Sequence, residues 1–174
     1  MNKKNKKREL YLVAFVLLAL YFSLFETVIP KPFPWMKLGL ANLATIIVLV
    51  KFDKKMAFEV LFLRILIQGM MIGTLFTPGF FISLTSGIIS TGVMCLLYNF
   101  RKHISLVAIS IVSALTHNIV QLIVVYFLLF RNVDIMGRSI FIFILIFLGI
   151  GVVSGGIIGI IATKLRLRET LIRH

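Results

Sequence analysis

Long apolar runs alternate with short polar segments along the whole chain. A run of about 20 apolar residues is long enough to cross the hydrocarbon core of a bilayer as a helix. Runs of this kind occupy residues 10–29, 56–76, 80–98, 104–130 and 139–163, and a shorter one occupies residues 38–50. The pattern predicts an all-α integral membrane protein with six transmembrane helices, which form a single domain over residues 1–174.

The segments between the runs are basic, polar or rich in proline. Residues 1–8 are strongly basic, and the apolar run after them is too long for a cleaved signal peptide, so we expect it to be retained. Thr77–Gly79 predicts a tight turn between the third and fourth runs. The first connection holds Pro30, Pro32, Pro34 and Trp35, and because proline cannot continue a helix, it predicts an aromatic turn.

Composition supports placement in lipid. Hydrophobic residues make up 60% of the 174 residues, the mean hydropathy is +1.06, and Asp and Glu together number only 6. Soluble domains are nearer about 45–50% apolar. Such a chain has too few polar side chains to cover itself in water.

The net charge of +13 comes from basic clusters between the apolar runs. With the N-terminus inside, 14 of the 19 Lys and Arg residues flank the inner side, four flank the outer side, and Arg64 lies within a helix. This bias obeys the positive-inside rule and predicts cytoplasmic termini. Clusters of this spacing suit anionic membrane lipid and indicate no nucleic-acid partner.

Polar residues inside the runs are the candidate site. They are Glu26, Asn42, Arg64, Gln68, His117, Asn118 and Gln121. Such side chains are costly in hydrocarbon and by default face the bundle interior or a cavity. The helical rise places most of them in the central-to-outer half of the bilayer. We therefore expect a substrate-binding pocket for a small solute that opens outward, with the Pro30–Trp35 turn as its lid.

Each of these residues has a structural alternative. A buried Ser, Asn, Gln or His often only bonds to a neighbouring helix. Arg64 could pair with Glu26 or Glu59, or it could bind an anion. Glu59 lies near the inner boundary, where we expect Lys54 or Lys55 to be its partner.

Gly151, Gly155 and Gly159 recur every four residues in the last run. Small residues at this spacing allow helix backbones to approach closely. The pattern predicts close packing within the bundle, and the alternative is a docking face for another membrane subunit.

The sequence favours no catalytic chemistry, metal or cofactor. It has no H-E-x-x-H, G-x-S-x-G or Walker motif. Asp53 and Asp134 are its two aspartates, whereas Mg²⁺-dependent work on a diphosphate needs several carboxylates. A Ser113–His117 dyad would lack an oxyanion hole. The single Cys95 offers neither a disulfide nor a paired metal site.

Several stretches resemble the signature of one bacterial membrane family. They are Glu26–Pro32, Lys37–Asn42, Arg64, Ser83–Gly87 with Ser90 and Met94, and Ala114–Asn118 with Gln121. The family is catalogued as heptaprenyl diphosphate synthase component I and is also called the Gx transporter family. The resemblance covers nearly the whole chain, although Ser113 stands where the family has glycine.

The two family names imply different functions. The transporter name implies a fold similar to the substrate-binding S components of energy-coupling factor transporters, which work with a coupling transmembrane protein and ATPases. The buried polar residues favour this interpretation. One departure is that Ala14 and Ala19 are followed four residues later by Leu18 and Ser23, where S components usually present Ala-x-x-x-Ala.

The synthase name implies the alternative, a membrane accessory subunit of prenyl diphosphate synthesis for menaquinone. The chain lacks the aspartate-rich motif of a prenyl synthase, so a separate synthase would be its partner. The basic inner loops, Lys51–Lys55 above all, would then make the contact.

Overall fold

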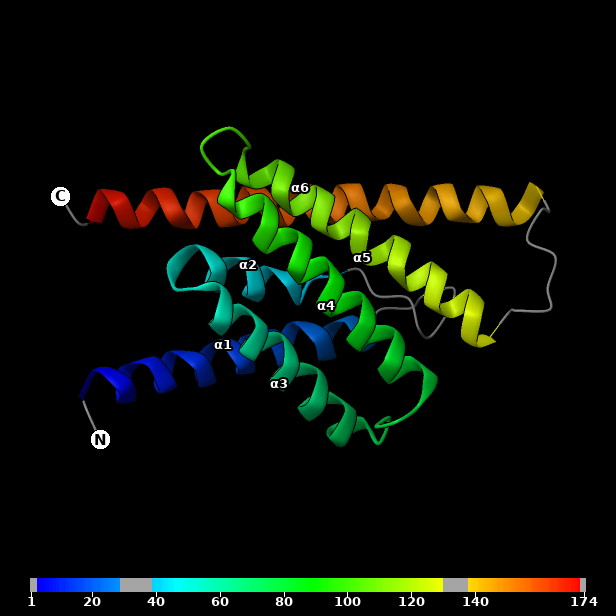
Figure 1. Cartoon of the computed structure of the whole chain (residues 1–174), viewed down its shortest axis with the longest axis horizontal. Helices are drawn as coiled ribbons and strands as arrows, with labels where there is room; N and C mark the ends of the chain where they lie inside the picture. The colour runs from blue at the N-terminus through cyan, green and yellow to red at the C-terminus, as the bar shows by residue number, and fades with distance from the viewer. Residues whose placement is uncertain (1–2, 29–38, 130–137, 173–174) are drawn as a thin grey trace.

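The computed structural model describes residues 3–28, 39–129 and 138–172, and these residues form six helices (Figure 1). The helices are α1 (Lys3–Val28), α2 (Asn42–Lys51), α3 (Lys54–Ile72), α4 (Pro78–Asn99), α5 (Leu106–Leu129) and α6 (Arg138–Ile172). The all-helical prediction is therefore confirmed for this part of the chain. The predicted lid, Pro30, Pro32, Pro34 and Trp35, lies outside the described residues.

Two helices extend beyond the apolar runs that predicted them. α1 begins at Lys3 although its apolar run begins at Leu10, and α6 continues to Ile172 although the run ends at Thr163. Both extensions are rich in Lys, Arg, Glu and Leu, which have high helix propensity. The length of an apolar run therefore indicates how much of a helix suits lipid, and it does not give the full length of the helix.

The turn between α3 and α4 differs from the prediction. α3 ends at Ile72 because Gly73 adopts a left-handed conformation with φ 70°, which is a common helix stop. Pro78 is the first residue of α4, where its fixed φ and missing N–H suit a helix start. The turn therefore occupies residues 73–77, and Thr77–Gly79 is the entry to α4.

Four helices are long and apolar enough to cross a membrane. The segments are Lys6–Val28, Pro78–Asn99, Leu106–Leu128 and Ile140–Leu165. α2 has 10 residues and would reach only about 15 Å at the helical rise of about 1.5 Å per residue. Six crossings and cytoplasmic termini stay predictions.

The helices pack in two linked groups. α5 packs against α4 and α6, while α1, α2 and α3 pack against one another. The groups are joined where α3 packs against α4 and where α2 packs against α6 and α4. In Figure 1 α3 and α4 run side by side from the turn that connects them. The main apolar core includes Ala19, Ala44, Ile46, Met56 and Val60 of the first three helices, and it extends to residues of α4, α5 and α6.

The surface is apolar and the interior holds polar side chains. Leu10, Leu17 and Tyr21 on α1 are each more than 60% exposed, and only 17% of the most apolar window of α6 is buried. In contrast, Glu26, Arg64 and other polar side chains are buried. This arrangement suits a lipid surrounding, in which apolar side chains face outward at no cost.

Candidate functional site

The seven predicted site residues all lie in the interior. Each is at most 6% exposed. They come from four helices, with Glu26 on α1, Asn42 on α2, Arg64 and Gln68 on α3, and the other three on α5. Their burial matches the expectation from the cost of polar groups in hydrocarbon, and their binding role stays a prediction.

The first group of polar contacts joins α1, α2 and α3. Ser23 donates a 2.6 Å hydrogen bond to Oε1 of Gln68. The carboxylate of Glu26 accepts the backbone N–H of Leu40, just before α2, and acts electrostatically on Arg64. Glu26, Arg64 and Gln68 are thus brought together around the start of α2.

Arg64 lies in the electrostatic field of Glu26, and one of its nitrogen atoms lacks a hydrogen-bond partner among the described residues. Sequence analysis left Glu26 and Glu59 open as acidic partners of Arg64. Glu26 is the one whose charge acts on Arg64. Among the described residues the Nε of Arg64 has no hydrogen-bond partner. A guanidinium carries five N–H donors and cannot accept a hydrogen bond. The N–H at Nε of Arg64 therefore still lacks an acceptor.

The second group joins α4, α5 and α6. Nδ1 of His117 lies 3.4 Å from the hydroxyl of Ser90, and Ser113 donates a 3.0 Å bond to the carbonyl of Ser90. Asn118 donates a 3.0 Å bond to the carbonyl of Phe147 on α6. The single hydroxyl hydrogen of Ser113 is therefore engaged by backbone, and the hydroxyl beside His117 belongs to Ser90.

The three glycines of α6 face α5. A Cβ added at Gly151 would lie 2.4 Å from Nδ2 of Asn118, and one at Gly159 would lie 2.6 Å from Cα of Val107. At Gly155 the distance to Cα of Ile111 would be 2.9 Å. Packing within the bundle accounts for the spacing, and docking to another subunit stays a prediction.

Several buried hydroxyls were not among the predicted site residues. Ser83, Ser86 and Ser90 lay in the family-like stretches, and their spacing of three and four residues on α4 was the signal for a shared face. Thr45 and Thr91 are also buried, and Thr91 directly follows Ser90 in the chain.

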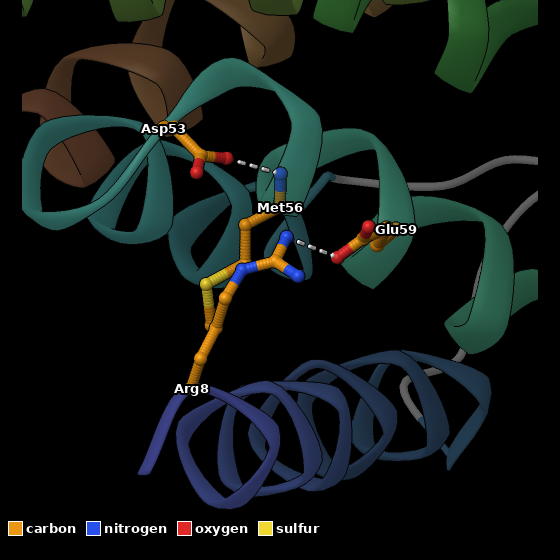
Figure 2. Close-up of polar contacts among 4 residues, drawn as sticks. All are labelled: Arg8, Asp53, Met56 and Glu59. Carbon is orange, nitrogen blue, oxygen red and sulfur yellow. Dashed lines mark hydrogen bonds and ion pairs between the residues drawn. The ribbon is translucent and has the colours of Figure 1, made fainter. Parts of the chain in front are cut away.

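One end of the bundle carries a cluster of exposed charge. Arg8 on α1 reaches across to α3, where its Nη2 lies 2.9 Å from Oε2 of Glu59 (Figure 2). The prediction that Glu59 pairs with Lys54 or Lys55 was wrong. Nζ of Lys54 instead donates a 2.6 Å bond to Oδ1 of Asn99 on α4.

We call this region the basic end, defined by the exposed charged residues Lys6, Lys7, Arg8, Glu9, Lys51, Asp53, Lys54, Lys55, Arg101, Lys102 and Lys164. The start of α1, the α2–α3 and α4–α5 connections and the last turns of α6 all lie toward the left of Figure 1. Among the residues whose side-chain burial is described, 6–28, 39–128 and 140–165, these are all the exposed Asp, Glu, Lys and Arg side chains. Within these ranges, exposed charge therefore gathers at one end.

Among the described residues, no three or more His, Cys, Asp or Glu gather into a group that could hold a metal ion. The family described as heptaprenyl diphosphate synthase component I matches residues 15–165, which is most of the chain. No curated protein and no solved structure matches.

Proposed function

Because the chain belongs to the heptaprenyl diphosphate synthase component I family, we propose that it is a membrane-embedded component of prenyl diphosphate synthesis that assists a separate synthase. The family match over residues 15–165 is the observation that carries this proposal. The four apolar helices able to cross a membrane supply the anchor.

The chemistry of the product explains why such a synthase would need a membrane partner. Each added CH₂ favours transfer out of water by about 0.8 kcal/mol, so a growing prenyl chain increasingly prefers the bilayer. An anchor that holds the synthase at the surface would let the tail enter lipid while the diphosphate stays in water. The apolar surface of α1 and α6 suits that role.

The basic end is the proposed contact for the synthase. Lys55 and Lys102 are exposed and form no ion pair with the described residues, so both are available to an acidic surface. The contacts Arg8–Glu59 and Lys54–Asn99 tie α1, α3 and α4 together at the same end of the bundle. Complementary charge across such an interface accelerates association and sets its orientation.

Reversing these charges tests the proposal. The full chain is co-expressed with the soluble prenyl diphosphate synthase of the same cell, and membranes are assayed for bound synthase and for prenyl diphosphate formation. Lys55→Glu with Lys102→Glu should lower both by roughly tenfold or more, since like charges would then face an acidic partner. Met71→Ala, at an exposed position near the opposite end of α3, is the control. Unchanged binding and synthesis in the double variant would refute the proposal.

A second candidate is binding and uptake of a small polar solute. Burial of all seven predicted site residues supports it, because polar groups within membrane bundles often mark a ligand path. A coupling membrane protein with ATPases would then be the partner.

Co-purifying metabolites separate the two candidates. If the protein binds a solute, native mass spectrometry of the detergent-purified protein should show a bound small molecule. The His117→Ala variant should lose this molecule, and the exposed control His103→Ala should retain it. A bound synthase without any small molecule would count against solute uptake.

A further inference from the structure

Three buried polar atoms lack a hydrogen-bond partner in the described part of the chain. They are Oγ1 of Thr45 on α2, Nε of Arg64 on α3 and Oγ1 of Thr91 on α4. The three side chains are at most 4% exposed. A buried group of this kind keeps its full desolvation cost unless something bonds to it, and the cost is larger for a charge.

The three helices that carry these atoms pack against one another in pairs. Gly87 of α4 lies against Leu61 and Ile65 of α3, because an added Cβ would come within 3.0 and 3.2 Å of their Cδ1 atoms. Arg64 adjoins Ile65 in the chain, and Thr91 is one turn beyond Gly87. Arg64 and Thr91 therefore differ in height by about one turn, or roughly 6 Å.

Thr45 lies at a similar height. α2 and α3 are joined by only Phe52 and Asp53, so they run antiparallel from the basic end. Thr45 is six residues before the end of α2, and Arg64 is ten residues after the start of α3. At the helical rise this difference is again about 6 Å. The long Arg64 side chain spans a distance of that size.

Glu26 does not complete this site. It acts on Arg64 by charge, while its carboxylate accepts the N–H of Leu40. Glu26 therefore lowers the cost of burying the guanidinium without supplying an acceptor to Nε. What the three atoms share is the ability to donate to an oxygen acceptor.

We propose that the meeting point of α2, α3 and α4 binds an oxyanion group of a small molecule, a phosphate or a carboxylate. Arg64 is the anchor, since a planar guanidinium bonds such groups through two parallel N–H donors. Thr45 and Thr91 donate further bonds from the flanking helices. This site shares Arg64 with the predicted solute pocket and names the chemical group that this residue would recognise, and its occupancy requires neither a synthase partner nor uptake.

Isothermal titration calorimetry on the full chain in detergent tests the site with three probes: inorganic phosphate, inorganic diphosphate and acetate. At least one should bind the wild type, and preference between the phosphates and acetate assigns the group. Arg64→Gln should weaken binding at least 100-fold. Thr91→Val and Thr45→Val should each weaken it about three- to tenfold, the effect of one hydrogen bond. Arg101→Gln, an exposed arginine at the basic end, should change affinity less than twofold.

Three results would overturn the proposal. The first is that none of the probes binds, which would leave water as the partner of these atoms. The second is that Arg101→Gln weakens binding as much as Arg64→Gln, which would place the anion at the basic end. The third applies if the Arg64→Gln variant does not fold. In that case, unchanged affinity in both the Thr45→Val and Thr91→Val variants would exclude this location.

Discussion

Ser23 on α1 and Gln68 on α3 are joined by a 2.6 Å side-chain hydrogen bond, and both side chains are buried. The residues are 45 positions apart, so the bond forms only once the two helices pack. The surrounding contacts between α1 and α3 are mostly apolar and less directional. This bond therefore helps to fix their relative rotation and height.

Ser23→Ala should lower the free energy of unfolding by about 1–3 kcal/mol, because it leaves the buried Oε1 of Gln68 without this donor. Thermal or denaturant unfolding of the detergent-purified protein measures the loss. Ser23→Ala combined with Gln68→Leu should be less destabilised than Ser23→Ala alone, since no polar atom is then stranded. A double variant no more stable than the single one would show that the bond has little influence.

Gly159→Ala should destabilise the bundle by about 1–3 kcal/mol through overpacking, because its Cβ would press on the backbone of Val107. The matched control is Gly149→Ala on the same helix, where nothing lies within 4 Å of the added atom. That control should be neutral or stabilising by up to about 1 kcal/mol, from helix propensity. Equal unfolding temperatures for the two variants would contradict close packing of α6 on α5.

Asp53→Ala should cost about 1 kcal/mol, because Oδ1 of Asp53 caps α3 by accepting the N–H of Met56 at 2.6 Å (Figure 2). Asp53→Asn keeps an oxygen acceptor and should retain most of the stability. Unfolding measurements on the Ala and Asn variants distinguish the contribution of the capping hydrogen bond from that of the negative charge. If Asn were as damaging as Ala, the negative charge would be the source of the effect.

Arg8→Gln should change stability by only about 0–1 kcal/mol, although it breaks the ion pair with Glu59. The two side chains are 43% and 28% exposed, and ions in solution screen such a pair. Unfolding curves at low and high salt test this, with the small difference expected to shrink as salt rises. A large, salt-independent loss would show that the pair is shielded from water.

The order and number of the helices followed from the apolar runs because both depend on the same local property, the length of apolar sequence. Helix ends did not follow, since Lys3–Glu9 and the last turns of α6 are polar yet helical. The stop at Gly73 depends on one backbone conformation, which hydropathy does not encode.

Burial of Glu26, Arg64 and Gln68 was predictable from the cost of placing them in lipid. Their partners were not, because pairing depends on contacts between distant segments. Arg8 and Glu59 are 51 residues apart, whereas sequence proximity favoured a near neighbour such as Lys55 as the partner of Glu59. Thr45 and Thr91 were not predicted as site residues because a threonine hydroxyl can bond to a carbonyl of its own helix, so threonine in an apolar run does not by itself indicate a ligand.

Confinement of exposed charge to the basic end also bears on how permanent the orientation of the protein is. In a bilayer, inversion would carry the nine Lys and Arg side chains of this end through the hydrocarbon core. Insertion scales put each such residue at about 2.5–3.5 kcal/mol at the centre of a helix. Even with partial neutralisation by Glu9, Asp53 and Glu59, the barrier is far above thermal energy. A molecule inserted with the basic end on one side of a membrane would therefore keep that orientation.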